Sequence, residues 1–196
     1  MNDREFFNSL ASKWDEICNH DEIKIRKIIE LSKVEKGCKV LDVGTGTGVL
    51  VKYLLELLPE TIKAVDLSEN MIEIAKGKYN DERVEFVAGD IMEFHEGNFD
   101  YIFLYSVYPH FTDKEKLFSH LYKLLNENGK IIIAHSESKE KINNIHKKSD
   151  SVKDHLLPEG KITANIMSRY FQIDKIIDDE EMYFVSGILV TETDKG

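Results

Sequence analysis

A glycine-rich segment carries the clearest chemical signal in this sequence. Asp42 precedes three alternate glycines, at positions 44, 46 and 48, and the apolar run Lys39–Val43 leads directly into them. Glycines let the backbone adopt positive φ and let a ligand approach closely. The spacing is not the G-x-G-x-x-G of a dinucleotide site, and no Gly-Lys-Ser/Thr of a P-loop follows. A carboxylate at this position suits a ligand that carries a positively charged amino group.

Two further acids stand at the ends of the next two strand-like runs. Asp66 closes the second run about 20 residues after the glycine loop, where a carboxylate can accept both hydroxyls of a ribose. Asp90 follows the third run, where it can accept from an adenine amino group while Ile91 packs on the ring. Each acid alone is more often a helix cap. Acids at the ends of three successive strands indicate one ligand site.

The segment after the fourth strand-like run is aromatic. Tyr105 and Tyr108 could place electron-rich faces near a cationic ligand, although either could equally belong to the core. His110 follows them in the same loop.

Four histidines fall on the expected substrate side: His110, His135, His146 and His155. One or two of them could act as a general base, because neutral imidazole is matched to pH 7. Alternatively, three could bind a divalent metal, or all could be solvated or hydrogen-bonded side chains without a chemical role. The segment Lys139–Lys161 is mildly basic. One hypothesis is therefore an anionic substrate, held by Lys139, Lys141, Lys147 and Lys148.

Strand-like and helical runs alternate along most of the chain. The expected strands are Lys39–Val43, Ile62–Leu67, Val84–Ala88, Phe99–Tyr105, Ile131–His135, Ile173–Ile177 and Met182–Thr191. The expected helices are Asp21–Leu31, Leu50–Leu58, Ser68–Lys76, Thr112–Leu125 with a capping box at Thr112 and an end near Gly129, and Ile162–Tyr170.

This alternation predicts a parallel sheet with helices on both faces. The last two strands meet across Asp178–Glu181 with no room for a helix, so we expect an antiparallel hairpin at the sheet edge. The predicted fold class is α/β: a doubly wound, Rossmann-like sheet of seven strands, mostly parallel, with an antiparallel C-terminal hairpin.

Composition narrows the classes of partner. The 196 residues include 36 acids and 26 bases, a net charge of −10, which disfavours nucleic acid and an anionic membrane surface. The cysteines, Cys18 and Cys38, form no CxxC pair and predict no metal site of their own. Without a signal peptide or an apolar run of membrane-spanning length, we expect a cytoplasmic protein.

The acid-x-G-x-G-x-G turn, the acid ending the second strand and the Gly89–Asp90 pair resemble the class I S-adenosylmethionine-dependent methyltransferases, over roughly residues 20–191. The resemblance implies that S-adenosyl-L-methionine is the cofactor. It implies that Asp42 and the Gly44–Gly48 backbone hold the methionine end, that Asp66 takes the ribose, and that Leu67, Met71, Asp90 and Ile91 take the adenine. The full expected cofactor set is Asp42, Gly44, Thr45, Gly46, Gly48, Asp66, Leu67, Met71, Gly89, Asp90, Ile91 and Tyr105.

The segment ahead of the core, residues 1–19, is expected to form an N-terminal lid helix, and it contains the sole tryptophan, Trp14. In relatives such a segment often lies over the cofactor as a lid, although plain packing on the sheet would explain it as well. The remaining residues, 20–196, are expected to form the methyltransferase domain, with a polar substrate-side insertion at about 136–160.

The expected function is transfer of a methyl group to a small-molecule acceptor by in-line displacement. His110, His135 and Tyr108 are the candidate catalytic residues in the substrate pocket, and no metal site is expected. Two alternatives stay open: a non-catalytic S-adenosylmethionine-binding or regulatory module, and a NAD-dependent oxidoreductase, which the glycine spacing and Asp42 disfavour.

Overall fold

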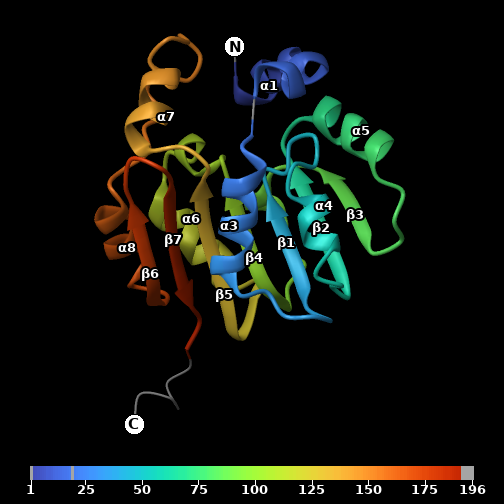
Figure 1. Ribbon diagram of the computed structural model, residues 1–196, viewed down its shortest axis with the longest axis vertical. Coiled ribbons are helices and arrows are strands. Elements are labelled where there is room, and N and C mark those ends of the chain that lie inside the picture. The colour runs from blue at the N-terminus through green and yellow to red at the C-terminus, as the bar shows by residue number, and fades with distance from the viewer. Residues whose placement is uncertain (1, 19, 191–196) are drawn as a thin grey trace.

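One mixed sheet organises the protein, in the strand order β3-β2-β1-β4-β5-β7-β6 (Figure 1). The computed structural model describes residues 2–18 and 20–190. The strands are β1 Lys39–Val43, β2 Thr61–Asp66, β3 Val84–Ala88, β4 Phe99–Tyr105, β5 Leu125–His135, β6 Gln172–Asp178 and β7 Tyr183–Ile188. The expected fold class is confirmed.

The central strands are buried on both faces, which explains their continuous apolar sequences. Along β1, Val40 packs with one core cluster and Leu41 with the cluster on the opposite face. The first five strands pair in parallel, whereas β7 runs antiparallel to both β5 and β6. The predicted edge hairpin is therefore present. Thr191, the last residue of its expected second strand, lies outside the described residues.

Helices cover both faces of the sheet. Core contacts place α3 (Glu22–Ser32), α4 (Val51–Leu55) and α5 (Glu69–Lys78) on one face, and α6 (Lys114–Leu121) and α8 (Gly160–Met167) on the other. Two short 3-10 turns follow β3 and β4, namely η2 (Ile91–Glu93) and η3 (Tyr108–His110).

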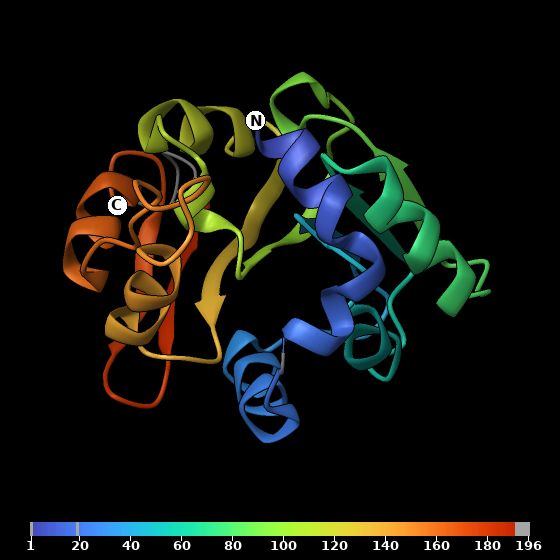
Figure 2. The same cartoon turned by 90° about the horizontal axis from the view of Figure 1, so that it is seen from above.

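Further helices lie above the carboxyl ends of the parallel strands. They are α1 (Asp3–Leu10), η1 (Ala11–Lys13), α2 (Trp14–Ile17) and α7 (Lys139–His146). Figure 2 shows α1 beside α5, with α7 on the opposite side of the carboxyl edge. The N-terminal segment is thus three short helices, α1, η1 and α2, rather than one lid helix; the outer limits of the expected lid, Met1 and Asn19, lie outside the described residues.

The region between β4 and β5 differs most from the sequence-based prediction. The helix begins two residues after Thr112, because the Asp113 side chain accepts from the Lys116 amide as its cap (2.8 Å). It ends at Leu121, well before Gly129, because Leu125 already pairs with Phe99 as part of β5. The expected helix boundaries here are wrong, because strand pairing takes residues that local periodicity assigned to the helix.

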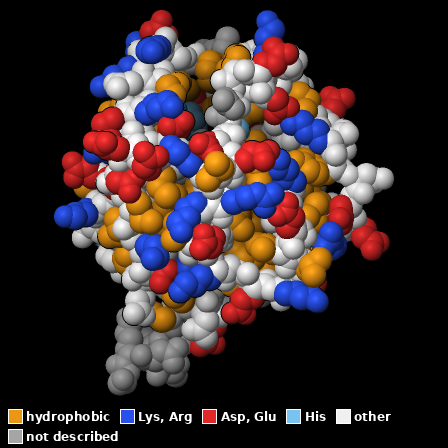
Figure 3. All heavy atoms as spheres, in the orientation of Figure 1, with side chains coloured by type: hydrophobic (Ala, Val, Ile, Leu, Met, Phe, Trp, Pro, Cys, Tyr) orange, Lys and Arg blue, Asp and Glu red, His pale blue; other side chains and the backbone are white. Residues whose placement is uncertain are grey.

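The charged side chains are mixed in sign over the surface. Figure 3 shows basic and acidic side chains interspersed on the face of Figure 1, without a continuous basic area on that face. Within the described part of the chain, no helix has both the length and the apolar character needed to cross a bilayer.

Candidate functional site

A cavity of about 350 Å³ opens at the carboxyl ends of β1, β2, β3 and β4. Twelve of the residues named from the sequence line it: Trp14, Gly44, Thr45, Gly46, Asp66, Leu67, Met71, Gly89, Asp90, Ile91, Tyr105 and His110. Asp42, Gly48, Tyr108, His135, His146 and His155 do not. The cavity lies where an open α/β sheet binds its ligands, beyond the strand ends beside β1 and β4.

The glycine loop is fixed to the end of the neighbouring strand. The Gly44 and Thr45 amides both donate to the Val65 carbonyl, at 2.8 and 3.1 Å. Gly44 has φ +69°, and a Cβ there would lie 2.3 Å from Cγ2 of Val107, in the loop after β4. Gly44 therefore lets the loops after β1 and β4 approach each other closely, side by side along the cavity wall.

Asp42 lies beneath the glycine loop instead of facing the cavity. It is 1 % exposed and accepts a hydrogen bond from Thr45 Oγ1 at 2.7 Å. Burial raises the pKa of its carboxyl to about 7. Its position does not support the expected contact with the amino group of a ligand. Instead, its hydrogen bond with Thr45 stabilises the conformation of the glycine loop.

Gly48 likewise faces away from the cavity. It has φ +85°, and a Cβ there would lie 2.7 Å from the ring of Tyr79, just beyond the end of α5. This glycine is required for close packing of the loop against α5, so the repeated spacing combines two cavity-lining glycines with one packing glycine.

The acid at the end of β2 is held by backbone amides. Asp66 Oδ2 accepts from the Gly46 amide and Oδ1 from the Ser68 amide, both at 2.8 Å. Burial raises the pKa of this carboxyl above its usual value. Each oxygen keeps a second lone pair, so the carboxylate is fixed in orientation and can still accept from a ligand hydroxyl.

The wall after β3 offers open space and an acceptor. Gly89 lines the cavity, and an added Cβ there would meet no protein atom within 4 Å. Asp90 Oδ1 accepts from the Met92 amide at 2.9 Å, which turns the chain into η2 and brings Ile91 and Met92 to the cavity.

A hydrogen-bonded chain closes the end of β4. Tyr105 Oη donates to Ser136 Oγ (2.9 Å), and His20 Nδ1 lies 2.9 Å from the same hydroxyl. Burial raises the pKa of Tyr105 to about 12, so its phenol stays protonated at neutral pH. The next residue, Ser106, has φ +56° and lines the cavity, a strained conformation of the kind that clusters at ligand sites.

Two expected catalytic residues belong to the core. Tyr108 is fully buried and stacks on Phe118, with ring centroids 5.8 Å apart. His135 is 1 % exposed and packs against Tyr183, and burial lowers its pKa to about 3. Because neither residue lines the cavity, their positions do not support direct roles in catalysis.

Of the four histidines expected on the substrate side, His110 is the one that lines the cavity, which His20 also lines. Its Nδ1 lies 2.9 Å from Nδ1 of His155, and its ring centroid lies 5.1 Å from that of His146. Burial lowers the pKa of His110 well below its usual value, and nearby histidines lower it further. Among the described residues, no group of three or more His, Cys, Asp or Glu side chains is arranged to hold a metal.

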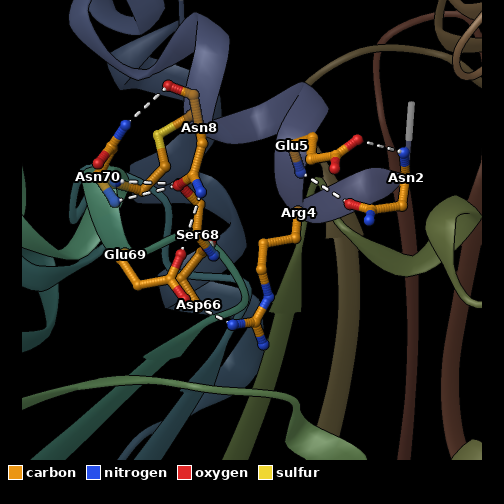
Figure 4. A network of polar contacts seen from close by, with 9 residues as sticks. Asn2, Arg4, Glu5, Asn8, Asp66, Ser68, Glu69 and Asn70 are labelled. Atoms are coloured by element: carbon orange, nitrogen blue, oxygen red, sulfur yellow. Dashed lines mark hydrogen bonds and ion pairs between the residues drawn. The ribbon is translucent and has the colours of Figure 1, made fainter.

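The N-terminal segment closes the cavity from above. Asn8 accepts from Ser68 Oγ (2.6 Å) and the Asn70 amide (3.2 Å), and Arg4 pairs with Glu69 at 2.5 Å (Figure 4). These contacts dock α1 on the start of α5, while Phe7 and Trp14 line the cavity.

The charge around the cavity is acidic. Its lining includes Asp3, Asp66, Asp90 and Asp113, and Lys116 is the single Lys or Arg among the described lining residues. Lys139 and Lys141, which were candidates for an anionic acceptor, pair with Glu140 and Glu137. Neither they nor Lys147 and Lys148 line the cavity, so that hypothesis has no support.

Several lining residues carried no recognisable motif. Phe7 belongs to the same aromatic segment as Trp14, so this segment was a usable signal. His20 and Ser106 gave none, because their positions depend on how distant segments pack around Tyr105. No sequence signal marked these further lining residues either: Asp3, Phe111, Thr112, Asp113 and Lys116.

The strand order and the cavity at the strand ends define a Rossmann-like α/β protein with a cavity beside the glycine loop. Residues 34–181 match the model of a methyltransferase domain family. The chain belongs to the class I S-adenosylmethionine-dependent methyltransferases.

The relatives act on different molecules. The chain is 30 % identical over 178 residues to the Ubiquinone/menaquinone biosynthesis C-methyltransferase UbiE of Escherichia coli O1:K1, covering 84 % of this chain and 70 % of that protein. It is 32 % identical over 119 residues to Phosphoethanolamine N-methyltransferase 2 of Caenorhabditis elegans, covering 58 % of this chain but 27 % of the nematode protein.

A solved structure shares the fold. Phosphoethanolamine N-methyltransferase 2 of Haemonchus contortus, in complex with phosphomonomethylethanolamine and S-adenosylhomocysteine, superposes with a TM-score of 0.76 and 17 % identity. The match covers 95 % of this chain and 58 % of that one.

Proposed function

We propose that this protein transfers a methyl group from S-adenosylmethionine to a small, uncharged or weakly charged acceptor. The observation that carries the proposal is one cavity shared by two sets of residues. The glycine loop, Asp66 and Asp90 make up the proposed cofactor side, and His110 lines the same cavity. The aromatic N-terminal segment spans both, because Trp14 lies near Gly46 and Phe7 packs edge-on against His110.

The cofactor side fits a nucleoside with a short charged tail. Asp66, oriented by two amides, would accept from the ribose hydroxyls, and Asp90 from the adenine amino group. Leu67, Met71 and Ile91 supply apolar surface for the base, and Gly89 leaves room beside it. Gly44, Thr45 and Gly46 would border the methionine end, with Tyr105 at the far wall.

When bound, S-adenosylmethionine supplies a sulfonium-activated methyl group, so the protein mainly contributes alignment and exclusion of water. Phe7 and Trp14 cover the cavity from the N-terminal segment and would exclude solvent. Burial keeps the His110 imidazole neutral at pH 7, so its lone pair is free to take the proton that the acceptor loses, and the same burial makes it a weaker base than an exposed histidine.

The acceptor is constrained by charge. A phosphate group needs clustered basic side chains, whereas this cavity is lined by four acids and one lysine. This argues against phosphoethanolamine, the substrate in the name of one relative. It favours a neutral acceptor, of which the ubiquinone precursors suggested by the other relative are one example.

The test is calorimetry with S-adenosylmethionine, S-adenosylhomocysteine and NAD, followed by turnover assays with phenolic, amine and phosphoethanolamine acceptors. We expect binding of both adenosyl compounds and turnover with a neutral acceptor. Binding of NAD alone would overturn the proposal, and cofactor binding without turnover of any acceptor would point to a regulatory module.

A further inference from the structure

His110 and His155 form a contact that constrains the protons on both rings. Their Nδ1 atoms lie 2.9 Å apart, with the rings nearly perpendicular at 80°. In a hydrogen bond between two neutral imidazoles, one nitrogen donates and the other accepts. The hydrogen bond made by one nitrogen of a histidine decides whether the other nitrogen is free to accept a proton.

The segment that carries His155 is tied to α7 by three hydrogen bonds. His146 Nδ1 donates to the His155 carbonyl at 2.5 Å. The Asn143 side chain donates to the Leu157 carbonyl (3.0 Å) and accepts from the Leu157 amide (2.7 Å). His155 is therefore presented to His110 by a clamped segment, although 45 residues separate the two in sequence.

The surroundings of His110 keep its ring neutral. His135, at the end of β5, His146 and His155, around α7, and Lys114, on α6, all disfavour a positive charge on it, and burial disfavours it most. From α1, the ring of Phe7 meets it edge-on at 5.1 Å. With Nδ1 engaged by His155, Nε2 is the nitrogen left to serve the cavity.

We propose that His155 is a positioning residue that holds His110 as its Nδ1–H tautomer, so that the Nε2 lone pair is available to the methyl acceptor. This rests on the proposed function, in which His110 takes the acceptor's proton. In that step the acceptor's X–H bond breaks, its proton passes to Nε2, and Nδ1–H continues to donate to His155. An isolated histidine in water favours the opposite, Nε2–H form, so the tautomer is a measurable signature.

The test is NMR spectroscopy of the full chain labelled with ¹⁵N in its histidine rings, saturated with S-adenosylhomocysteine at pH 7.5. Long-range ¹H–¹⁵N correlations distinguish the tautomers, and His110→Gln identifies the His110 signals by their loss. We expect Nδ1–H on His110 and Nε2–H on His155. In His155→Leu, we expect the tautomer ratio of His110 to move toward Nε2–H by about five-fold, which one ordinary hydrogen bond sustains.

A conservative variant separates positioning from simple packing. In His155→Asn, the side-chain oxygen can stand near the former Nδ1 and accept from His110, so we expect the Nδ1–H form to return. The matched control is His95→Leu. His95 pairs with His120 at a ring distance of 5.7 Å away from the lining of the cavity, so this change should leave the His110 signals in place.

The outcomes separate this inference from the proposed function. An Nε2–H tautomer on His110 in the unmodified protein overturns the inference, whether or not any variant folds. An unchanged tautomer in His155→Leu overturns it as well. Calorimetry on the same samples reads cofactor binding independently: if S-adenosylhomocysteine does not bind, the proposed function fails, while the tautomer of the unliganded protein still decides the inference.

Discussion

At the scale of single residues, Asp66 carries the most specific expectation for ligand binding. Replacing it by Asn sets an amide NH₂ against one of the two backbone N–H donors that now reach its oxygens. We expect Asp66→Asn to weaken binding of S-adenosylhomocysteine by about 10- to 100-fold, ~1.4–2.7 kcal/mol. Isothermal titration calorimetry measures this directly.

Asp100 provides a matched control for that change. Its carboxylate also accepts from a backbone amide, that of Lys39 at 2.8 Å, but it lies near the start of β4, at the opposite end of the strand from the cavity. Asp100→Asn should therefore leave the affinity unchanged. Equal losses in the two variants would mean that Asp66 acts through stability alone.

Gly44 and Gly77 together test how backbone conformation and room for a Cβ atom affect stability. Gly44→Ala places a methyl group 2.3 Å from Val107 at φ +69°, so we expect a loss of about 2–4 kcal/mol in the free energy of unfolding. Gly77 is helical, and its added Cβ meets nothing within 4 Å, so Gly77→Ala should stabilise by about 0.5–1 kcal/mol. Urea denaturation of both variants checks the difference in sign.

Most of the residues expected from the sequence to hold the cofactor line the cavity, but the sequence did not show how each one is oriented. Asp66, Gly89 and Asp90 were placed at the strand ends by pattern alone, because parallel strands bring their carboxyl ends to one edge. Asp42 and Gly48 share the same motif, yet one lies under the loop and the other against Tyr79. Spacing marks a tight turn, but the direction of each side chain depends on packing with distant segments.

At the scale of elements, α1 is the helix through which the N-terminal segment packs against α5. Asn8 joins it to Ser68 and Asn70 at the start of α5. We expect Asn8→Ala to loosen the segment and expose the single tryptophan, Trp14, which lines the cavity. Quenching of its fluorescence by acrylamide should increase by about two-fold, because losing these side-chain hydrogen bonds makes local opening of the N-terminal segment more frequent.

The exposed Asn165, on α8, is the control for that measurement, and Asn165→Ala should leave quenching unchanged. If S-adenosylhomocysteine protects Trp14 in the unmodified protein but quenching in Asn8→Ala stays at the unmodified level, the docking of α1 does not govern access to the cavity.

The elements themselves were predictable where local and long-range preferences agree. Strand β1 and the cap of α5 at Ser68 match the expected positions, because an apolar run and a capping hydroxyl suffice. The helix after β4 was misplaced because Asp113, rather than Thr112, caps it and because Leu125 pairs with Phe99. Such pairing between strands is not written into a local window of sequence.

At the scale of the whole molecule, buried histidines set the response to acid. The pKa of His135 is lowered to about 3 by burial, while in the unfolded chain it returns to about 6.5. Between these values the unfolded state binds more protons, so the free energy of unfolding falls as the pH falls. In His135→Phe, we expect the loss between pH 7 and pH 5 to be smaller by about 2 kcal/mol.

Chemical denaturation at a series of pH values measures this, with the exposed His95→Phe as control. Asp42 acts in the opposite direction, since its raised pKa of about 7 favours the folded state at low pH. Because Asp42 is present in every variant, its contribution cancels in the comparison. A pH profile of His135→Phe parallel to that of the unmodified protein would contradict the assignment.

The sequence predicted that His110, His146 and His155 fall on one side of the molecule, but not which of them touch. His110, His146 and His155 meet because residues 136–159 fold back beside the loop after β4, through contacts such as the one between Asn143 and Leu157. The net charge of −10 did not predict that acids line the cavity. The meeting of the three histidines depends on the path of the chain after β5.

The close approach of Gly44 to Val107 also has an evolutionary consequence. It couples the two loops at one point, so a lineage that acquires a new acceptor would have to keep this pair while altering residues further along. Tyr108 and Leu157 are buried in the core, whereas exposed and half-buried positions in the segments 108–113 and 136–159, other than His110 and His155, can vary without moving the glycine loop. Divergence of acceptor preference within a single cofactor framework should therefore concentrate there, and an engineered library would best be confined to those two segments.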